Sequence, residues 1–359
     1  MINNLYTTLI ITLLILLQSC ASFPDIYIGV VDIKGAFSPD GTKLALISQR
    51  DKPEELALYA ANVDGGDPIC LSRDISWYVP PIFTPDNKNI LYSSKDNRKV
   101  LSVDIDTGEC KGVFTLSGNT HSRYISADTN LIVFQQISLR DKPALIILKR
   151  KENIVKEFND EDFPYETSFI EISPDSSMIA FGHEKNIYTM EIDSGDIQCL
   201  TTKYSKQLEK SWYKSEFFLP FCFSPDNKQI AFATGDSIYL IDVTGNNLRR
   251  LIHYDKEYNM RIRDLSFTPD NKHLAFVSEG FVESNDGWQW QKPYAHGLYL
   301  YNFEKENQTR IYDATIYYVF SPDSNSILFV EGNMGYNRGM YIMDIDGSNK
   351  RRISPDWKH

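Results

Sequence analysis

Basic residues are scarce in this chain of 359 residues. Lysine and arginine total 37 against 48 aspartate and glutamate residues, which gives a formal net charge of −11 at pH 7. Proteins that bind nucleic acid ordinarily carry a basic surplus that neutralises phosphate groups. The one basic cluster, Lys350, Arg351, Arg352 and Lys358, is interpreted as a solvated terminal strand. Nucleic acid is therefore excluded as an expected partner.

Motifs for catalysis and cofactor binding are also missing. The chain contains no Gly-x-Ser-x-Gly nucleophile elbow, no His-Glu-x-x-His metal motif, no phosphate-binding loop and no dinucleotide fingerprint. No cofactor is expected, and no catalytic residue is assigned.

Cysteine is sparse as well, with five residues in the chain. Apart from Cys20 they are Cys70, Cys110, Cys199 and Cys222, an even number that permits disulfides in an exported protein. Each of the four falls within an expected strand, and none has a conspicuous loop spacing. We therefore interpret them as buried free thiols that pack as small hydrophobic side chains.

A single long apolar run stands at the beginning of the chain. Leu5–Leu17 is short for a membrane span but typical of the core of a signal peptide. It ends in Leu17-Gln18-Ser19-Cys20, which resembles a lipobox, the site where a bacterial signal peptide is cleaved and the cysteine is lipidated. Met1–Tyr6 lacks the usual Lys or Arg, so an uncleaved anchor is the alternative. We expect lipidation at Cys20.

The remaining sequence is dominated by an internal repeat. An apolar residue, then Ser or Thr, Pro, Asp, a turn residue and a short apolar strand recur six times, and a seventh copy has lost its proline. The Asp residues of the seven copies are Asp40, Asp86, Asp128, Asp175, Asp226, Asp270 and Asp323. They stand 46, 42, 47, 51, 44 and 53 residues apart, which is the period of four-stranded propeller blades.

Each repeat contains four strand signals, here called A to D. In the fifth copy they are Leu219–Ser224, Gln229–Thr234, Ser237–Val243 and Asn247–Leu251. Proline, aspartate and asparagine or glycine make the tight A–B turn, and sequences such as Asp64-Gly65-Gly66 make the C–D turn. The length after residue 23 accommodates seven such units. The sequence thus predicts an all-β fold, a β-propeller of four-stranded antiparallel blades with seven blades.

These repeats resemble the TolB-type, WD40-like propeller repeats built on Ser-Pro-Asp-Gly, over nearly the whole chain after residue 23. TolB-type proteins have six blades and an additional α/β domain, and neither feature is expected here, so their partners are not transferred. The expected division is a lipoprotein signal peptide at 1–19, a lipid anchor and short linker at 20–23, and the propeller at 24–359. How the ring closes stays open, because Asp25–Val31 and Lys350–Ser354 both resemble the outer strand of blade seven. Either a fifth strand forms there or one of the two segments is displaced.

The repeated aspartates invite interpretation as a metal or catalytic ring. Turn geometry explains them without a ligand, since Asp in such a turn bonds back to its own backbone. Asp104-Ile105-Asp106 and Asp344-Ile345-Asp346 lack the oxygen-ligand spacing of a calcium loop. No metal or catalytic role is assigned to these residues.

The two ends of the propeller are expected to differ. The A–B and C–D turns lie at one end, here called the turn face, and the B–C and D–A connections lie at the other, the loop face. The longest insertions, Thr201–Phe218 and Glu279–His296, both belong to the loop face. This face also collects aromatic residues, which favour protein interfaces and sugar stacking. The candidate binding residues are Trp77, Tyr78, Trp212, Tyr213, Trp288, Trp290 and Tyr294.

Four histidines map to the same face. They are His121, His183, His253 and His296, whereas His273 does not belong to this group. Some propeller lyases that act on oligogalacturonate hold a metal with histidines near the axis. No pair in this chain has metal-ligand spacing, so the four are only weak metal candidates.

The expected function is that of a binding module anchored to the outer membrane by lipid and facing the periplasm or the cell surface. Its expected partner is an envelope protein, a peptide or a glycan, bound at the loop face. The alternative is a lyase- or hydrolase-like enzyme that uses histidine and carboxylate groups on that face.

Overall fold

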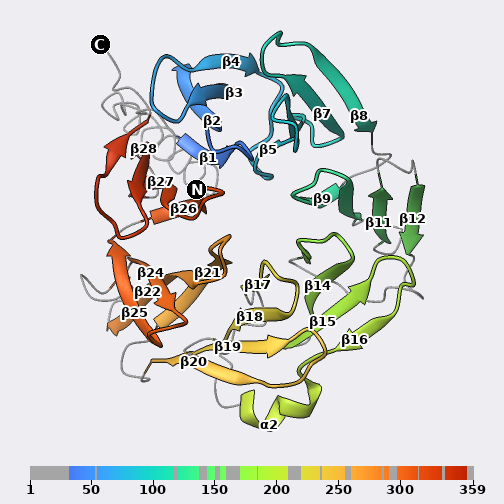
Figure 1. Cartoon of the computed structure of the whole chain (residues 1–359), viewed down its shortest axis with the longest axis vertical. Helices are drawn as coiled ribbons and strands as arrows, with labels where there is room; N and C mark the ends of the chain where they lie inside the picture. The colour runs from blue at the N-terminus through green and yellow to red at the C-terminus, as the bar shows by residue number, and fades with distance from the viewer. Residues whose placement is uncertain are drawn as a thin grey trace, which may run out of the picture.

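The computed structural model describes residues 32–52, 55–115, 120–136, 144–149, 154–158, 170–183, 185–208, 220–234, 237–254, 260–284, 287–290, 297–313, 315–333 and 336–353. Their strands form seven antiparallel sheets placed around one axis, and each sheet uses consecutive strands of the chain (Figure 1). The prediction of a seven-bladed β-propeller is therefore confirmed.

Blades one to three are each a meander of four strands. They contain β1 (Asp32–Phe37), β2 (Lys43–Lys52), β3 (Glu55–Asn62) and β4 (Ile69–Ser72); β5 (Ile82–Phe83), β6 (Asn89–Ser93), β7 (Lys99–Asp104) and β8 (Cys110–Thr115); and β9 (Thr120–Ile125), β10 (Leu131–Gln136), β11 (Ala144–Lys149) and β12 (Ile154–Phe158). The copy of the repeat around Asp128, which lacks the proline, thus forms a blade like the others.

Blades four to seven follow the same plan, with one extra strand in blade six. They contain β13 (Ile170–Ile172), β14 (Met178–His183), β15 (Asn186–Glu191) and β16 (Ile197–Cys199); β17 (Phe221–Phe223), β18 (Gln229–Ala233), β19 (Ser237–Asp242) and β20 (Arg249–His253); β21 (Met260–Phe267), β22 (His273–Ser284), β23 (Gly287–Trp290), β24 (Gly297–Asn302) and β25 (Asn307–Tyr312); and β26 (Thr315–Phe320), β27 (Ser326–Asn333), β28 (Tyr336–Asp344) and β29 (Arg351–Arg352).

Two short helices follow β16, at the start of the first long insertion. They are η1 (Thr202–Tyr204) and α2 (Ser205–Leu208), and α2 lies at the periphery of the ring (Figure 1). The side chain of Leu208 is buried in the core between blades four and five. Within the described residues, neither helix has the length or the apolar character needed to cross a membrane.

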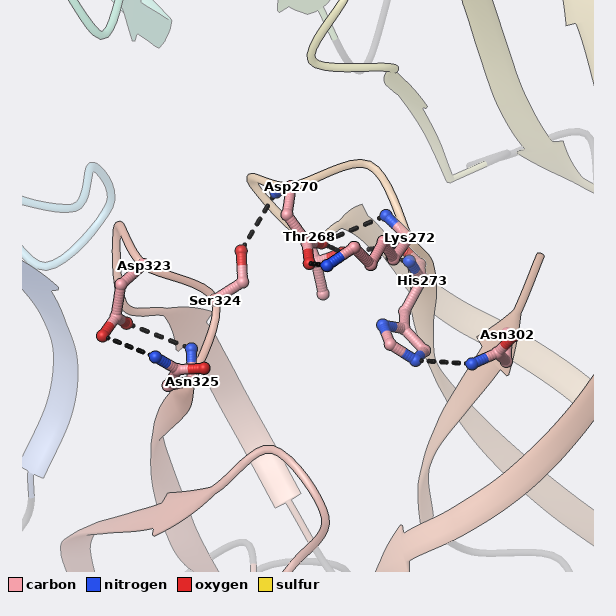
Figure 2. Close-up of polar contacts among 8 residues, drawn as sticks. All are labelled: Thr268, Asp270, Lys272, His273, Asn302, Asp323, Ser324 and Asn325. Atoms are coloured by element: carbon pink, nitrogen blue, oxygen red, sulfur yellow. Dashed lines mark hydrogen bonds and ion pairs between the residues drawn. The ribbon is translucent and has the colours of Figure 1, made fainter. Parts of the chain in front are cut away.

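The Ser/Thr-Pro-Asp motif makes the same hydrogen bonds at each A–B turn. In blade six the Thr268 hydroxyl donates to the Asp270 carboxylate (2.7 Å), and the backbone N–H of Lys272 donates to the same oxygen (3.0 Å; Figure 2). These contacts hold the pKa of the Asp270 carboxyl below its usual value, against the opposing effect of burial. The repeated aspartates are thus occupied by turn contacts, as their spacing predicts.

The side chain of the residue after the motif Asp links one blade to the previous one at four of the seven turns, through Asn87, Ser176, Asn227 and Ser324. This residue has positive φ, for example 60° at Asn87 and 63° at Ser324, a conformation that Asn and Gly tolerate best. Ser324 accepts a hydrogen bond from the backbone N–H of Asp270 in blade six (3.0 Å; Figure 2), and Asn87 accepts one from Asp40 (3.1 Å). Gly41 occupies this position at the junction of blades seven and one, so that junction lacks the side-chain link.

The apolar core is divided among the junctions between blades. Seven clusters of buried side chains are present in the described structure, and each combines residues of two adjacent blades. The cluster between blades seven and one contains Leu44, Tyr59, Leu328 and Met340. Each blade therefore buries both faces of its sheet, and the ring closes through packing.

Ring closure is completed by two polar contacts. The carboxylate of fully buried Asp32 in β1 accepts the backbone N–H of Met340 in β28 (2.9 Å), and the hydroxyl of Tyr317 in β26 donates to the carbonyl of Gly35 (2.7 Å). The outer strand of blade seven is β29, which agrees with the Lys350–Ser354 alternative. The competing Asp25–Val31 segment lies outside the described residues.

Replacing Asp226 with Ala should destabilise the fold by about 1–2 kcal/mol, because it removes two turn hydrogen bonds worth about 1 kcal/mol each. The Asp226 carboxylate accepts the Ser224 hydroxyl (2.6 Å) and the Lys228 backbone N–H (3.2 Å). Urea denaturation measures the change. Asp106→Ala is the control, because the Asp106 side chain makes no hydrogen bond with the described residues. Equal effects of both substitutions would contradict a role for the motif aspartate in holding the turn.

Candidate functional site

The loop face presents one exposed aromatic pair among the described residues. Trp77 and Tyr78 lie in the connection from β4 to β5, and their side chains are 48% and 57% exposed. Their rings are stacked, with centroids 4.4 Å apart and planes inclined by 25°. Two large aromatic side chains therefore form a single exposed surface, here called the aromatic platform.

The other candidate binding residues are only partly covered by the structure. Trp212, Tyr213 and Tyr294 lie outside the described residues. Trp288 and Trp290 belong to β23, which pairs with an extension of β22 to form a hairpin, and there Trp290 is opposite Phe281 and Trp288 is opposite Glu283. This hairpin lies within the expected insertion Glu279–His296 and was not predicted, although Val282 and Trp290 have the β propensity of a strand.

Tyr254, a further aromatic residue of the loop face, packs against neighbouring blades. The hydroxyl of Tyr254 donates to Gln308 of blade six (2.9 Å), and the ring packs against the core between blades five and six. Tyr254 therefore belongs to the fold.

The weak metal candidates are dispersed as far as the structure describes them. His183 ends β14 and His253 ends β20, where His253 Nδ1 lies 3.0 Å from the Ser237 hydroxyl. Only the backbone of His121 is described, in β9, and His296 lies outside the described residues. Within the part of the chain that the structure describes, no three His, Cys, Asp or Glu side chains come together as a metal site would require.

The cysteines differ from expectation in their burial. Cys70, Cys110, Cys199 and Cys222 are free thiols, as predicted. Only Cys222 is buried, whereas Cys70 and Cys110 are exposed. The prediction of burial was wrong for these two and for Cys199, which is partly exposed. The three lie on β4, β8 and β16, the outermost strands of their blades, where no further strand covers them.

A group of polar side chains at the ring axis was not predicted. Lys34, Glu171, Cys222, Asp264 and Tyr317 lie on the first strands of five blades, β1, β13, β17, β21 and β26. Figure 1 shows first strands such as β1, β17, β21 and β26 nearest the centre of the ring. We call these five residues the axial group.

Long-range electrostatic interactions link members of the axial group across the ring. The Asp264 charge acts on Lys34 of blade one, on Glu171 of blade four and on Tyr317 of blade seven. Blade five separates Glu171 from Asp264, and blade seven separates Asp264 from Lys34, so these interactions act across the axis.

Three members of the axial group follow a β-bulge at the same place in the repeat. The bulges lie between Asp32 and Lys34, between Ile262 and Asp264, and between Thr315 and Tyr317. Lys34, Asp264 and Tyr317 are each the fourth residue before the Ser or Thr of the turn motif. Bulges re-aim side chains and are frequent beside functional sites. The signal in the sequence was a polar residue at this same place, four residues before the turn motif, in three first strands.

Burial among the blades shifts the protonation equilibria of the axial group. Glu171 is partly accessible at the axis, yet protein surrounds it, and this desolvation together with the Asp264 charge raises its pKa to about 8. Burial lowers the pKa of Lys34, against the opposing effect of Asp264, and it raises the pKa of the Cys222 thiol. Near neutral pH the Glu171 carboxyl group is therefore mainly protonated.

The axial group is connected directly to the aromatic platform. The Lys34 ammonium donates a hydrogen bond to the backbone carbonyl of Tyr78 (2.7 Å). One charged side chain of the axial group thus contacts the backbone of the exposed pair.

The described structure is that of a seven-bladed β-propeller with a polar axis. It is similar to an oligogalacturonate lyase in complex with manganese (14% identity, TM-score 0.44, covering 90% of this chain and 78% of the lyase). It is also similar to TolB from Acinetobacter baumannii (17% identity, TM-score 0.47, covering 95% of this chain and 67% of TolB). No protein-family model matches the sequence, and no curated protein matches it.

Replacing Glu171 with Gln should remove a pH-dependent loss of stability. The folded-state pKa of about 8 exceeds the usual 4.5, so between these values the folded chain binds more protons than the unfolded chain. Stability contributed by this group is present below pH 4.5 and is lost as pH rises through 8, by at most about 1.4 kcal/mol per pH unit. Melting temperatures from pH 5 to 9 should therefore fall more steeply for the wild type than for Glu171→Gln. Parallel curves for the two proteins would contradict the raised pKa.

Proposed function

We propose that this chain is a binding module of the cell envelope that takes an envelope protein, a peptide or a glycan on its loop face. The observation that carries the proposal is the aromatic platform of Trp77 and Tyr78. Four large hydrophobic side chains of the described residues are strongly exposed: Ile69, Trp77, Tyr78 and Val155. Two of the four, Trp77 and Tyr78, are adjacent and stacked on each other, and the Tyr78 carbonyl accepts a hydrogen bond from Lys34.

Stacked exposed aromatic rings suit a binding surface for a physical reason. Trp and Tyr supply large contact areas with few rotatable bonds, so little side-chain entropy is lost when a partner covers them. Stacking of Trp77 on Tyr78 restricts both rings before any partner arrives. Preorganisation of this kind favours binding, because it reduces the ordering cost of association.

A lyase- or hydrolase-like activity is the second candidate function. It is favoured by the axial group, where Glu171 is mainly protonated at neutral pH and Asp264 lies within electrostatic reach. A carboxyl group that keeps its proton near neutral pH can serve as a general acid. Loss of a measured activity in Glu171→Gln without loss of ligand binding would favour this second candidate.

Replacing Trp77 with Ala should weaken partner binding at least tenfold and leave the fold stable. Aromatic anchors cost about 2 kcal/mol or more when truncated, and a factor of ten corresponds to about 1.4 kcal/mol. A photo-crosslinking residue at position 78 in native envelopes identifies the partner, and titration of the purified partner then gives its Kd. Ile69→Ala is the matched control, since Ile69 is 63% exposed on β4, away from the platform. If Trp77→Ala lowers the melting temperature but keeps the partner, the pair is a packing element and the proposal fails.

Anchoring by lipid at Cys20 and retention at the outer membrane are part of the proposal. They are supported by the Leu5–Leu17 run, by the lipobox-like Leu17-Gln18-Ser19-Cys20 and by Ala21, since no aspartate follows the cysteine as an inner-membrane retention signal. These residues lie outside the described part of the chain.

Replacing Cys20 with Ser should block lipidation, because serine lacks the thiol that takes the lipid. The expected result is unprocessed precursor and altered membrane partitioning, measured by labelling with a radioactive or clickable fatty acid and by detergent phase separation. Unchanged processing and partitioning would exclude the lipid anchor.

A further inference from the structure

The outer edge of blade seven is joined to both neighbouring blades through one short segment. Strand β29 pairs with β28 through Arg351 and Arg352 alone. Residues 350–353, here called the blade-seven strap, extend one cationic side chain toward each neighbouring blade. Because the side chains of successive strand residues point to opposite faces of a sheet, Lys350 reaches blade six and Arg351 reaches blade one.

Lys350 binds blade six through both its charge and aromatic rings. Its ammonium donates to Glu331 of β27 (2.7 Å) and to the hydroxyl of Tyr312 on β25, and that hydroxyl donates to Glu331. The Lys350 Nζ also lies 4.6 Å from the centroid of the Tyr312 ring and 4.2 Å from that of the Tyr341 ring, within the range of cation–π attraction. One cation therefore joins the strap to blades six and seven.

The strap also reaches the apolar core between blades seven and one. The Arg351 guanidinium donates to the carbonyl of Val63 in the C–D turn of blade one (2.5 Å). Ile353 is buried in the core cluster of this junction, and its backbone N–H donates to the carbonyl of Met340 (2.8 Å). The N–H of Met340 in turn donates to Asp32 of β1 (2.9 Å). The strap and β1 are therefore joined through a single residue of β28.

The junction of blades seven and one depends on such contacts more than the other junctions do. Every other pair of neighbouring blades is joined by the chain itself, whereas blades seven and one lie side by side only because the ring closes (Figure 1). Bringing together segments that are far apart in sequence costs more chain entropy than joining consecutive ones. This junction also has Gly41 at the turn position where Asn87, Ser176, Asn227 and Ser324 link other blades.

We propose that the blade-seven strap is a salt-sensitive latch that determines where the ring opens. Lys350 and Arg351 hold Ile353 in the core of the junction, and when their contacts are released, blade one separates from blade seven before any other junction opens. Salt acts on this latch because the side chains of Lys350 and Glu331 are 31% and 32% exposed, and ion pairs that solvent reaches are screened. The latch is independent of the binding function proposed above.

Hydrogen exchange of backbone amides in the full chain tests the latch. The double variant Lys350→Met, Arg351→Met removes both charges and keeps apolar stems of similar length. The amides of Met340 and Ile353 should then exchange at least tenfold faster, because each donates a hydrogen bond that breaks when the junction opens. The amides of β10 and β18, in blades three and five, should keep their protection.

Salt gives a second measurement on the wild type. Raising NaCl from about 0.1 M to about 1 M shortens the screening length from about 10 Å to about 3 Å. Exchange at Met340 and Ile353 should accelerate over this range in the wild type and should stay constant in the double variant. If the double variant does not fold, Lys350→Met takes its place, and acceleration at the same two amides is expected.

Arg249→Met is the matched control, because Arg249 is an exposed cation that pairs with Glu306 across blades five and six (3.1 Å). It should leave exchange at Met340 and Ile353 unchanged. Unchanged exchange at these two amides in the strap variant, equal acceleration in every blade, or an equal effect of Arg249→Met would overturn the inference.

Discussion

The packing of one sheet against the next is the interaction on which this structure depends. Every blade carries apolar side chains on both faces, and each of the seven core clusters in the described structure is shared by two neighbours. If the blades formed an open row instead of a ring, the first and the last blade would each expose one apolar face to solvent. Closing the ring removes both ends. The contacts of Leu44 and Tyr59 with Leu328 and Met340 are therefore as important as any contact within a blade.

The turn motif adds a second, polar level of organisation. Within a turn, the Asp carboxylate accepts the hydroxyl of Ser or Thr and a backbone N–H two residues later. Between turns, the left-handed residue reaches back to the preceding blade, as Ser324 does to Asp270. The same short sequence thus sets the strand corner and the spacing between blades. This dual role accounts for the recurrence of the aspartate in every repeat.

Features that depend on local sequence were predictable, and features that depend on ring geometry were not. The seven turn motifs and the four strand signals predict the blades, including the worn copy around Asp128. The loop-face position of Trp77 and Tyr78 also follows from strand order, and the structure adds their stacking. The axial group was missed because Glu171 and Asp264 are far apart in sequence and belong to blades that do not touch. Exposure of Cys70 was mispredicted because strand signals do not say whether a strand is the outermost of its blade.

The axis is the place where seven similar units become different from one another. Elsewhere the repeat has the same residue types in the same positions, because apolar side chains of two adjacent blades pack together at each junction. At the fourth residue before the turn motif, blades one, six and seven instead carry Lys34, Asp264 and Tyr317, each after a bulge. Burial of Glu171, together with the Asp264 charge, raises the pKa of Glu171 and so disfavours its ionised form. A cost of this kind at the centre of the fold is understandable if the group serves a ligand, since stability alone would favour apolar side chains there.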